Sequence, residues 1–144
     1  MTALRDGAPE ILLVEDDPDD LELALRAIRE HRVAVRIEVA RDGAEALRLL
    51  DAQDRLPTVV ILDLGLPKVD GLEVLRRIRM DLRTRCLPVV VLSSSSEQGT
   101  VLESYRLGVN SYVRKPVDAD GFSSCVRDLG HYWVGVNEAP PEGP

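Results

Sequence analysis

Five short apolar runs recur along the 144-residue chain, and a longer segment separates each from the next. The runs are Ile11 to Val14, Arg36 to Ala40, Thr58 to Leu62, Pro88 to Leu92 and Asn110 to Arg114. All five have the length of a β-strand. Several are apolar throughout instead of alternating with polar residues, which is typical of strands covered by helices on both faces.

The segments between and after the runs carry apolar residues at helical spacing. Each therefore presents one apolar stripe, as in the series Leu21, Ala24, Leu25 and Ile28. Strand and helix alternate five times, which predicts an α/β fold with one doubly wound parallel sheet. Local signals predict the helix boundaries, with starts at Pro18 and after Asp42, Asp70 and Asp118, and an end before Gly108.

Length and composition predict one soluble domain. We expect an N-terminal tail over residues 1–9, a folded domain over 10–130 and a partly disordered extension over 131–144, which is rich in proline near its end. No apolar run approaches the roughly 18 residues that a membrane span needs. The first ten residues lack the apolar stretch of a signal peptide, so we expect a cytoplasmic protein that does not bind membranes.

Charge and cysteine content narrow the function further. The 25 acidic and 18 basic residues give a net charge of −7, which opposes direct binding to nucleic acids. Two cysteines, Cys86 and Cys125, are too few to form a thiolate metal cage. We interpret both as small, buried apolar side chains.

Polar side chains follow the ends of four of the five predicted strands. They are Glu15, Asp16 and Asp17 after the first, Asp63 after the third, Ser93 and Ser94 after the fourth, and Lys115 at the end of the fifth. Ligands bind beyond the carboxyl ends of parallel strands, so we expect these groups to share one pocket. Clustered carboxylates repel one another unless a cation lies between them, and a set of oxygen ligands without His or Cys favours Mg²⁺.

Four strings in order, LLVEDD, LDLGLPKVDG, VVVLSS and SYVRKP, resemble the receiver domain of two-component response regulators over residues 10 to about 130. The resemblance implies a flavodoxin-like sheet with the strand order 2-1-3-4-5, and a sensor histidine kinase as the phosphodonor. It implies that Mg²⁺ is held by Asp16, by Glu15 through water, by Asp63 and by the backbone carbonyl of Gly65. Asp17 falls outside this set, and we interpret it as solvated or as supporting the site from outside.

The same resemblance implies that Asp63 is the phosphoacceptor. Ser93 matches the hydroxyl residue, Lys115 matches the lysine that pairs with the phosphoryl group, and Tyr112 matches the aromatic residue coupled to them. Physically, a carboxylate attacks a phosphoryl group poorly because like charges meet, and Mg²⁺ with Lys115 would remove that repulsion. The product would be an aspartyl phosphate, which would recruit Ser93, let Tyr112 turn and alter the face of the fourth helix, fifth strand and fifth helix.

Two other functions fit parts of this pattern. A small phosphohydrolase with an aspartate nucleophile would use the same groups, but it needs a second carboxylate two residues after the nucleophile, where Gly65 stands. A receiver that only docks partners would not need the complete acidic site. We also predict a cis Lys115–Pro116 peptide bond, because X–Pro bonds tolerate this geometry and the lysine has to point back into the pocket.

The carboxyl-terminal part, LGVNSYVRKPVD followed by GHYWVGV, resembles small stand-alone regulators that accompany phytochrome-type sensor kinases. Trp133 continues the apolar stripe of the last helix, so it either packs on its own domain or contacts a second copy. We expect a homodimer that uses the fourth helix, the fifth strand and the extension, with Tyr132, Trp133, Val134 and Val136 as candidate contacts.

Overall fold

The computed structural model describes residues 9–31, 35–95 and 97–141, and the described chain forms one parallel five-stranded sheet in the order β2-β1-β3-β4-β5. The strands are β1 (Ile11–Val14), β2 (Ile37–Ala40), β3 (Val59–Leu62), β4 (Val89–Ser93) and β5 (Ser111–Arg114). Neighbouring strands are paired in parallel throughout, as in the register of Val14 with Ala40 and Leu62. Each strand begins and ends within one residue of its predicted position, and the predicted strand order is confirmed.

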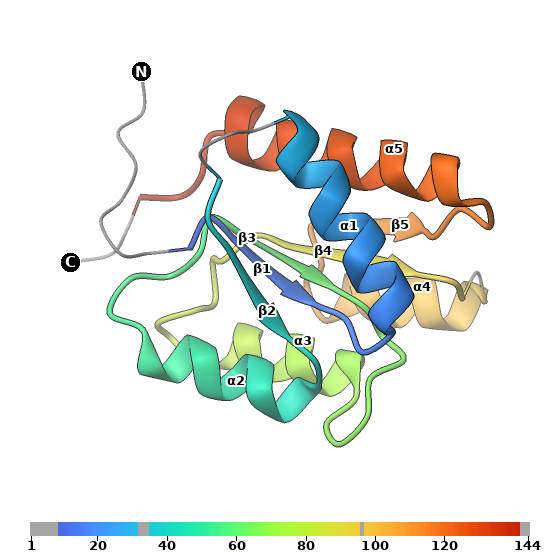
Figure 1. The fold of residues 1–144 in the computed structure, drawn as a ribbon. Coiled ribbons are helices and arrows are strands. Elements are labelled where there is room, and N and C mark those ends of the chain that lie inside the picture. Colours follow the sequence, from blue (N-terminus) through green and yellow to red (C-terminus); the bar gives the residue numbers. More distant parts are fainter. Residues whose placement is uncertain (1–8, 32–34, 96, 142–144) are drawn as a thin grey trace.

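Helices cover both faces of the sheet (Figure 1). They are α1 (Pro18–His31), α2 (Gly43–Ala52), α3 (Gly71–Met80), α4 (Gln98–Arg106) and α5 (Ala119–Gly130). Figure 1 shows α1 and α5 together on one face and α2 and α3 on the other, while α4 lies near β5.

The predicted helix boundaries are confirmed by side-chain caps. Asp42, Asp70 and Asp118 each accept a hydrogen bond from a backbone N–H in the first turn of the helix that follows. Gly108, just after α4, has a φ of +96°, which a residue with a side chain rarely adopts.

The sheet is buried on both faces, which explains why its inner strands are apolar throughout. Ile11 and Leu13 pack toward α1 and α5 in one apolar cluster, whereas Leu12 and Val14 pack toward α2 and α3 in another. All residues of β1, β3 and β4 are buried. The predicted doubly wound architecture follows from this two-sided burial.

The chain continues beyond α5 as one π-helical segment, η1 (His131–Val136). Trp133 and Val134 pack against the apolar cluster of α1 and α5, and the Trp133 ring meets the Tyr132 ring edge-on at a centroid distance of 5.1 Å. Tyr132 and Val136 are exposed. Residues 131–136 are therefore helical, and Trp133 packs on its own domain.

The two cysteines differ in how far they are buried. Cys86 is exposed, because the α3–β4 loop that carries it runs over the surface, so the prediction of a buried thiol is wrong there. Cys125 is half-buried.

Of the predicted N-terminal tail only Pro9 is described, and it is buried. Residues 1–8 and 142–144 lie outside the described residues, as does Ser96 of the polar loop after β4. Within the described chain, none of the helices has the length and apolar character that spanning a bilayer requires.

Candidate functional site

The predicted polar side chains meet at the carboxyl ends of the strands. Glu15 and Asp16 follow β1, Asp63 follows β3, Ser93 ends β4 and Lys115 follows β5. Most of these residues line one cavity of about 870 Å³ that also reaches Ser94, Ser95 and Pro116. Because all strands are parallel, the loops after them meet at the same edge, where the arrowheads in Figure 1 point.

Three carboxylates form an acidic cluster at this edge. One oxygen each of Glu15, Asp16 and Asp63 lies within 4.8 Å of the others. Glu15 is buried, Asp63 is half-buried and Asp16 is exposed, so the cluster opens to solvent on one side. Oxygen ligands at this spacing suit a hard divalent cation, which would offset their mutual repulsion. The acidic cluster therefore has the chemistry of a divalent metal site.

Burial and repulsion both act on Glu15. The pKa of Glu15 is raised to about 7, because burial and the neighbouring Asp63 carboxylate raise it by more than the nearby Lys115 lowers it. Without a cation, this carboxyl therefore holds a proton more tightly than an ordinary glutamate does. A bound cation would favour its ionised form.

Lys115 supplies the positive charge of the site. Its ammonium nitrogen lies 2.8 Å from Glu15 Oε1, 3.0 Å from Asp20 Oδ2 and 3.3 Å from Asp63 Oδ2. Only 11% of the side chain is exposed, and the Phe122 ring centroid lies 6.0 Å from the ammonium. Burial alone would lower the pKa of Lys115, but hydrogen bonds to Glu15 and Asp20 and the Asp63 charge raise it above its ordinary value, so the lysine stays charged.

Asp20 is the one partner of Lys115 that the sequence analysis missed. It lies in the first turn of α1, where an acidic residue is ordinarily explained by the helix dipole. The run of aspartates in DDPDD after β1 offered a weak signal, because a residue in the first turn of a helix lies near the strand end that precedes it. Either Asp19 or Asp20 could reach Lys115 as far as the sequence shows, and the direction of α1 in the structure selects Asp20.

Asp17 has a structural role at the start of α1. Its Oδ1 accepts hydrogen bonds from the backbone N–H groups of Asp19 and Asp20, at 2.8 and 3.3 Å. It therefore caps the helix and lies outside the acidic cluster. This agrees with its interpretation as a residue that supports the site from outside.

The loop after β3 holds Asp63 in place. The backbone N–H of Gly65 donates to Asp63 Oδ1 at 3.2 Å, and Gly65 lines the cavity. At the start of α3, a Cβ on Gly71 would stand 2.6 Å from the Asp63 carbonyl oxygen and 2.5 Å from the Leu64 Cα. A side chain does not fit there, so Gly71 lets α3 begin directly against the strand end that carries Asp63.

A hydrogen-bonded chain connects Ser93 to Tyr112. The Ser95 N–H donates to Ser93 Oγ at 3.2 Å, and the Tyr112 hydroxyl donates to the Ser95 carbonyl oxygen at 2.7 Å. Tyr112 is half-buried beside the α2–α3 cluster. The loop after β4 therefore joins the hydroxyl at the strand end to the aromatic ring on β5.

The prediction of a cis Lys115–Pro116 bond is wrong, because no peptide bond in the described residues is cis. The lysine reaches the pocket by another route. Its backbone N–H donates to the Ser93 carbonyl oxygen at 2.8 Å, which extends the β4–β5 pairing by one residue. This pairing directs the long Lys115 side chain toward the acidic cluster without a cis bond.

Comparison with known proteins places the pattern in one family. Residues 11–127 match the response regulator receiver domain. The probable methanogenesis regulatory protein FilR2 of Methanothrix harundinacea is 42% identical over 90% of this chain and 86% of its own. The response regulator Rcp1 of Synechocystis is 33% identical over 86% of this chain and 88% of its own.

Solved structures agree in fold. The phosphorylated cyanobacterial phytochrome response regulator RcpA superposes with a TM-score of 0.88 at 34% identity, covering 94% of this chain and all of RcpA. The Mn²⁺-bound form of Rcp1 superposes with a TM-score of 0.85 at 30% identity, covering 92% of this chain and all of that one. A divalent ion in Rcp1 is consistent with the acidic cluster found here.

Proposed function

Because this chain belongs to the receiver domain family of response regulators, we propose that it accepts a phosphoryl group on Asp63 from a sensor histidine kinase. Phosphoacceptor signalling is the function of the family. The choice of Asp63 is supported by its position: its carboxylate lines the cavity, belongs to the acidic cluster and lies 3.3 Å from a charged lysine. We take residues 10–130 as the receiver unit and the cytoplasm as its setting.

Glu15, Asp16, Asp63 and the Gly65 carbonyl would hold Mg²⁺, supported by the all-oxygen cluster. When bound, the ion would neutralise charge on the phosphoryl oxygens and on the carboxylates. An Asp63 carboxylate oxygen attacks phosphorus, and the bond from phosphorus to the donor breaks as the leaving group departs with its electron pair. Lys115 pairs with a phosphoryl oxygen, and the Ser93 hydroxyl donates to another.

The signal leaves through the loop after β4. When Ser93 turns toward the phosphoryl group, the hydrogen bond that its Oγ accepts from the Ser95 N–H is disturbed. The carbonyl oxygen of the same Ser95 accepts the hydrogen bond of the Tyr112 hydroxyl. A shift of this loop therefore frees the Tyr112 ring and changes the surface of α4, β5 and α5. The protein would catalyse only its own phosphorylation and dephosphorylation.

The phosphohydrolase alternative is not favoured. Gly65 stands two residues after Asp63 and has no side chain to act as acid or base. No other described carboxylate joins the acidic cluster to replace it. The groups proposed for forming an acyl phosphate are therefore present, whereas position 65 offers no side chain to act as the general acid of a phosphohydrolase.

The test is phosphotransfer from purified histidine kinases, phytochrome-type kinases among them, since RcpA is a phytochrome response regulator. We expect rapid transfer from the cognate kinase in Mg²⁺ and at least about tenfold slower transfer from other kinases, because interface electrostatics set the rate of encounter. Autoradiography of the two proteins over seconds to minutes measures it. If no histidine kinase labels the protein while a known receiver is labelled in parallel, the proposed donor is wrong.

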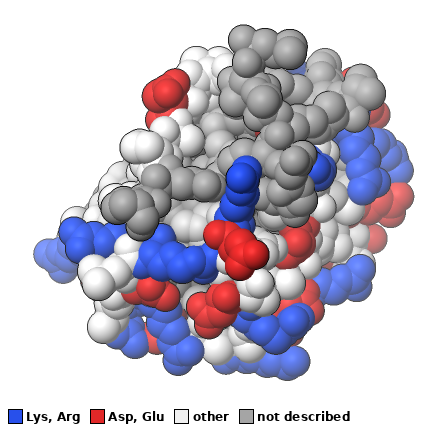
Figure 2. Space-filling model, turned by 90° about the vertical axis from the view of Figure 1, so that its left-hand side faces the viewer, with Lys and Arg blue, Asp and Glu red and all other residues white. Residues whose placement is uncertain are grey.

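The output surface is proposed to be a protein contact. The net charge of the chain is −7. Figure 2 presents the side of the molecule that lies away from α4, and there acidic and basic side chains are interspersed outside the grey residues. Neither observation favours the phosphate backbone of a nucleic acid as the partner.

We also propose a homodimer through η1, supported by the exposed Tyr132 and Val136. Figure 1 shows η1 at the end of α5 that points away from the β5–α5 loop, whereas α4 lies beside β5, so the extension and α4 do not adjoin. Because Trp133 and Val134 pack inward, the exposed pair is the better place to break a dimer.

We expect Val136→Asp to weaken the dimer by about 2 kcal/mol or more, because a charge would be buried in the contact. Sedimentation equilibrium at micromolar concentration measures this. Leu82→Asp, at a leucine that is 80% exposed in the α3–β4 loop, is the matched control and should leave the dimer intact. A monomeric wild type, or equal loss in both variants, would contradict the proposed interface.

A further inference from the structure

The ammonium group of Lys115 has three N–H donors, and three carboxylates surround it. The partners are Glu15, Asp20 and Asp63, at 2.8, 3.0 and 3.3 Å. Each donor therefore has one acceptor, and none remains for a further oxygen. An incoming phosphoryl oxygen can bind Lys115 only if one of these carboxylates gives up its hydrogen bond.

Asp20 differs from the other two partners in three ways. It comes from the first turn of α1 instead of a strand end. It is not part of the acidic cluster of Glu15, Asp16 and Asp63. Its side chain is 31% exposed, compared with 5% for Glu15 and 13% for Asp63. Of the three carboxylates, Asp20 can therefore replace its hydrogen bond to Lys115 by hydrogen bonds to water with the smallest loss of free energy.

We propose that Asp20 is a positioning residue that holds Lys115 in the unphosphorylated state and competes with the phosphoryl group for it. This inference rests on the proposed phosphorylation of Asp63. Asp20 takes part in no bond that forms or breaks. It acts through Lys115, and it sets how readily the lysine becomes available to the incoming phosphoryl oxygen.

The competition has a predictable sign. Asp20 occupies one of the three N–H donors of Lys115, at 3.0 Å. Holding Lys115 on Asp20 therefore slows phosphorylation, because the bond has to open before the lysine can meet the phosphoryl group. Asparagine keeps the shape of aspartate but accepts a weaker hydrogen bond, since it carries no charge. Removing the charge should speed the reaction.

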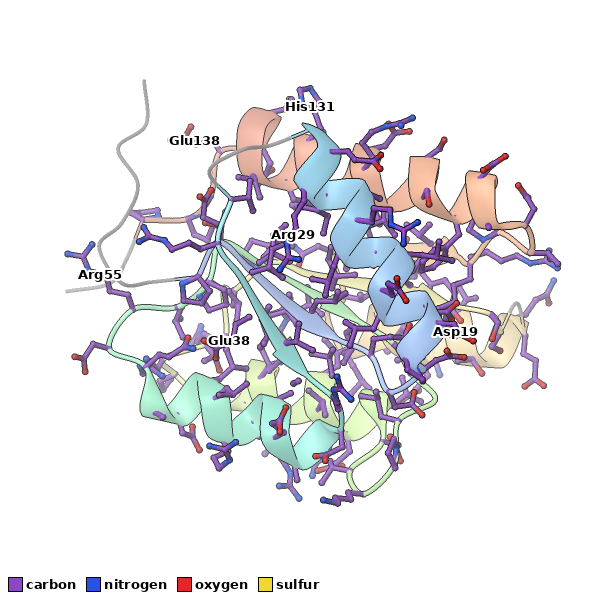
Figure 3. The ribbon with its side chains drawn as sticks, in the orientation of Figure 1. Asp19, Arg29, Glu38, Arg55, His131 and Glu138 are labelled. Atoms are coloured by element: carbon purple, nitrogen blue, oxygen red, sulfur yellow. The ribbon has the colours of Figure 1, made fainter. Side chains whose placement is uncertain are left out.

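The experiment measures the rate of phosphorylation by a small acyl phosphate in Mg²⁺, followed by intact mass, in wild type and Asp20→Asn. We expect Asp20→Asn to react about threefold to tenfold faster. Asp19→Asn is the matched control, because it removes the same charge from the same turn of α1. Asp19 is exposed, and Figure 3 labels it at the end of α1 nearest the carboxyl ends of the strands. It should change the rate less than about twofold.

A second background separates positioning from simple charge repulsion. In Lys115→Met, measured over longer incubations, Asp20→Asn should change the rate less than about twofold, because the residue through which Asp20 acts is absent. Mg²⁺ affinity, measured by calorimetry, should be the same in Asp20→Asn and wild type to within about twofold, since ligand losses are larger. Circular dichroism of each variant confirms the fold.

Three results would overturn the inference. Equal acceleration in Asp19→Asn and Asp20→Asn would show a general charge effect, as would an acceleration that persists in Lys115→Met. A large loss of Mg²⁺ affinity in Asp20→Asn would make Asp20 a metal ligand. If wild type itself takes up no phosphoryl group, the proposed function fails first, which is a separate and recognisable outcome.

Discussion

Asp63→Asn is expected to take up no phosphoryl group under conditions in which the wild-type protein is fully labelled. The Asp63 carboxylate lies within the acidic cluster, and one of its oxygens lies 3.3 Å from the Lys115 ammonium. An amide oxygen is a far weaker nucleophile than a carboxylate oxygen. Asparagine has nearly the same shape, so the Gly65 N–H keeps its acceptor and the fold is retained. Intact mass after incubation with a small acyl phosphate and Mg²⁺ measures the result.

Two controls make this experiment specific. An aspartyl phosphate is an acyl phosphate and hydrolyses easily, whereas a phosphoserine survives acid. A stoichiometric acid-stable adduct on Asp63→Asn would therefore assign the acceptor to another residue, such as a serine of the loop after β4. Equal labelling of the wild type in EDTA would show that no divalent cation is needed, which would contradict the role proposed for the acidic cluster.

Asp16→Ala is expected to weaken Mg²⁺ binding by about 100-fold, the upper end of the effects seen for groups around bound metals. Asp16 is the most exposed member of the acidic cluster and is free of the Lys115 contacts that hold Glu15 and Asp63. Its carboxylate is therefore the one most available to a cation. Calorimetric titration with Mg²⁺ measures the change.

Asp17→Ala is the matched control, because it removes an equal charge from the next residue. Asp17 caps α1 through two backbone N–H groups, so its loss should cost about 1 kcal/mol of stability in urea unfolding. Its effect on Mg²⁺ affinity should be below about threefold, since the charge lies outside the cluster. Equal losses of affinity in the two variants would show that the wrong acidic pair was assigned to the metal.

Much of the fold follows from local physics that a single sequence displays. The apolar runs become inner strands because both faces of a parallel sheet are covered, and the caps at Asp42, Asp70 and Asp118 need only a side-chain oxygen near the next turn. The meeting of Glu15, Asp63 and Lys115 was also predictable, because parallel strands bring their carboxyl ends to one edge.

Other features depend on how elements are directed in space. Asp20 reaches Lys115 across 95 positions because α1 leaves the sheet edge at one particular angle. Likewise, the hydrogen bond from Tyr112 to Ser95 depends on the path of the loop after β4. Neither spacing nor residue type encodes these directions, since many neighbouring acids and hydroxyls would satisfy the same pattern.

The sequence alone thus determined which strand ends carry charge and which strands are buried, because those properties depend on residue type and short-range periodicity. The tertiary structure decided which neighbour each charge meets. It placed Trp133 against α1 and α5, left Cys86 on the surface, and brought Lys115 into the site through its pairing with Ser93 instead of a cis bond. These outcomes depend on long-range packing, in which a side chain's partner is set by elements far away in the chain.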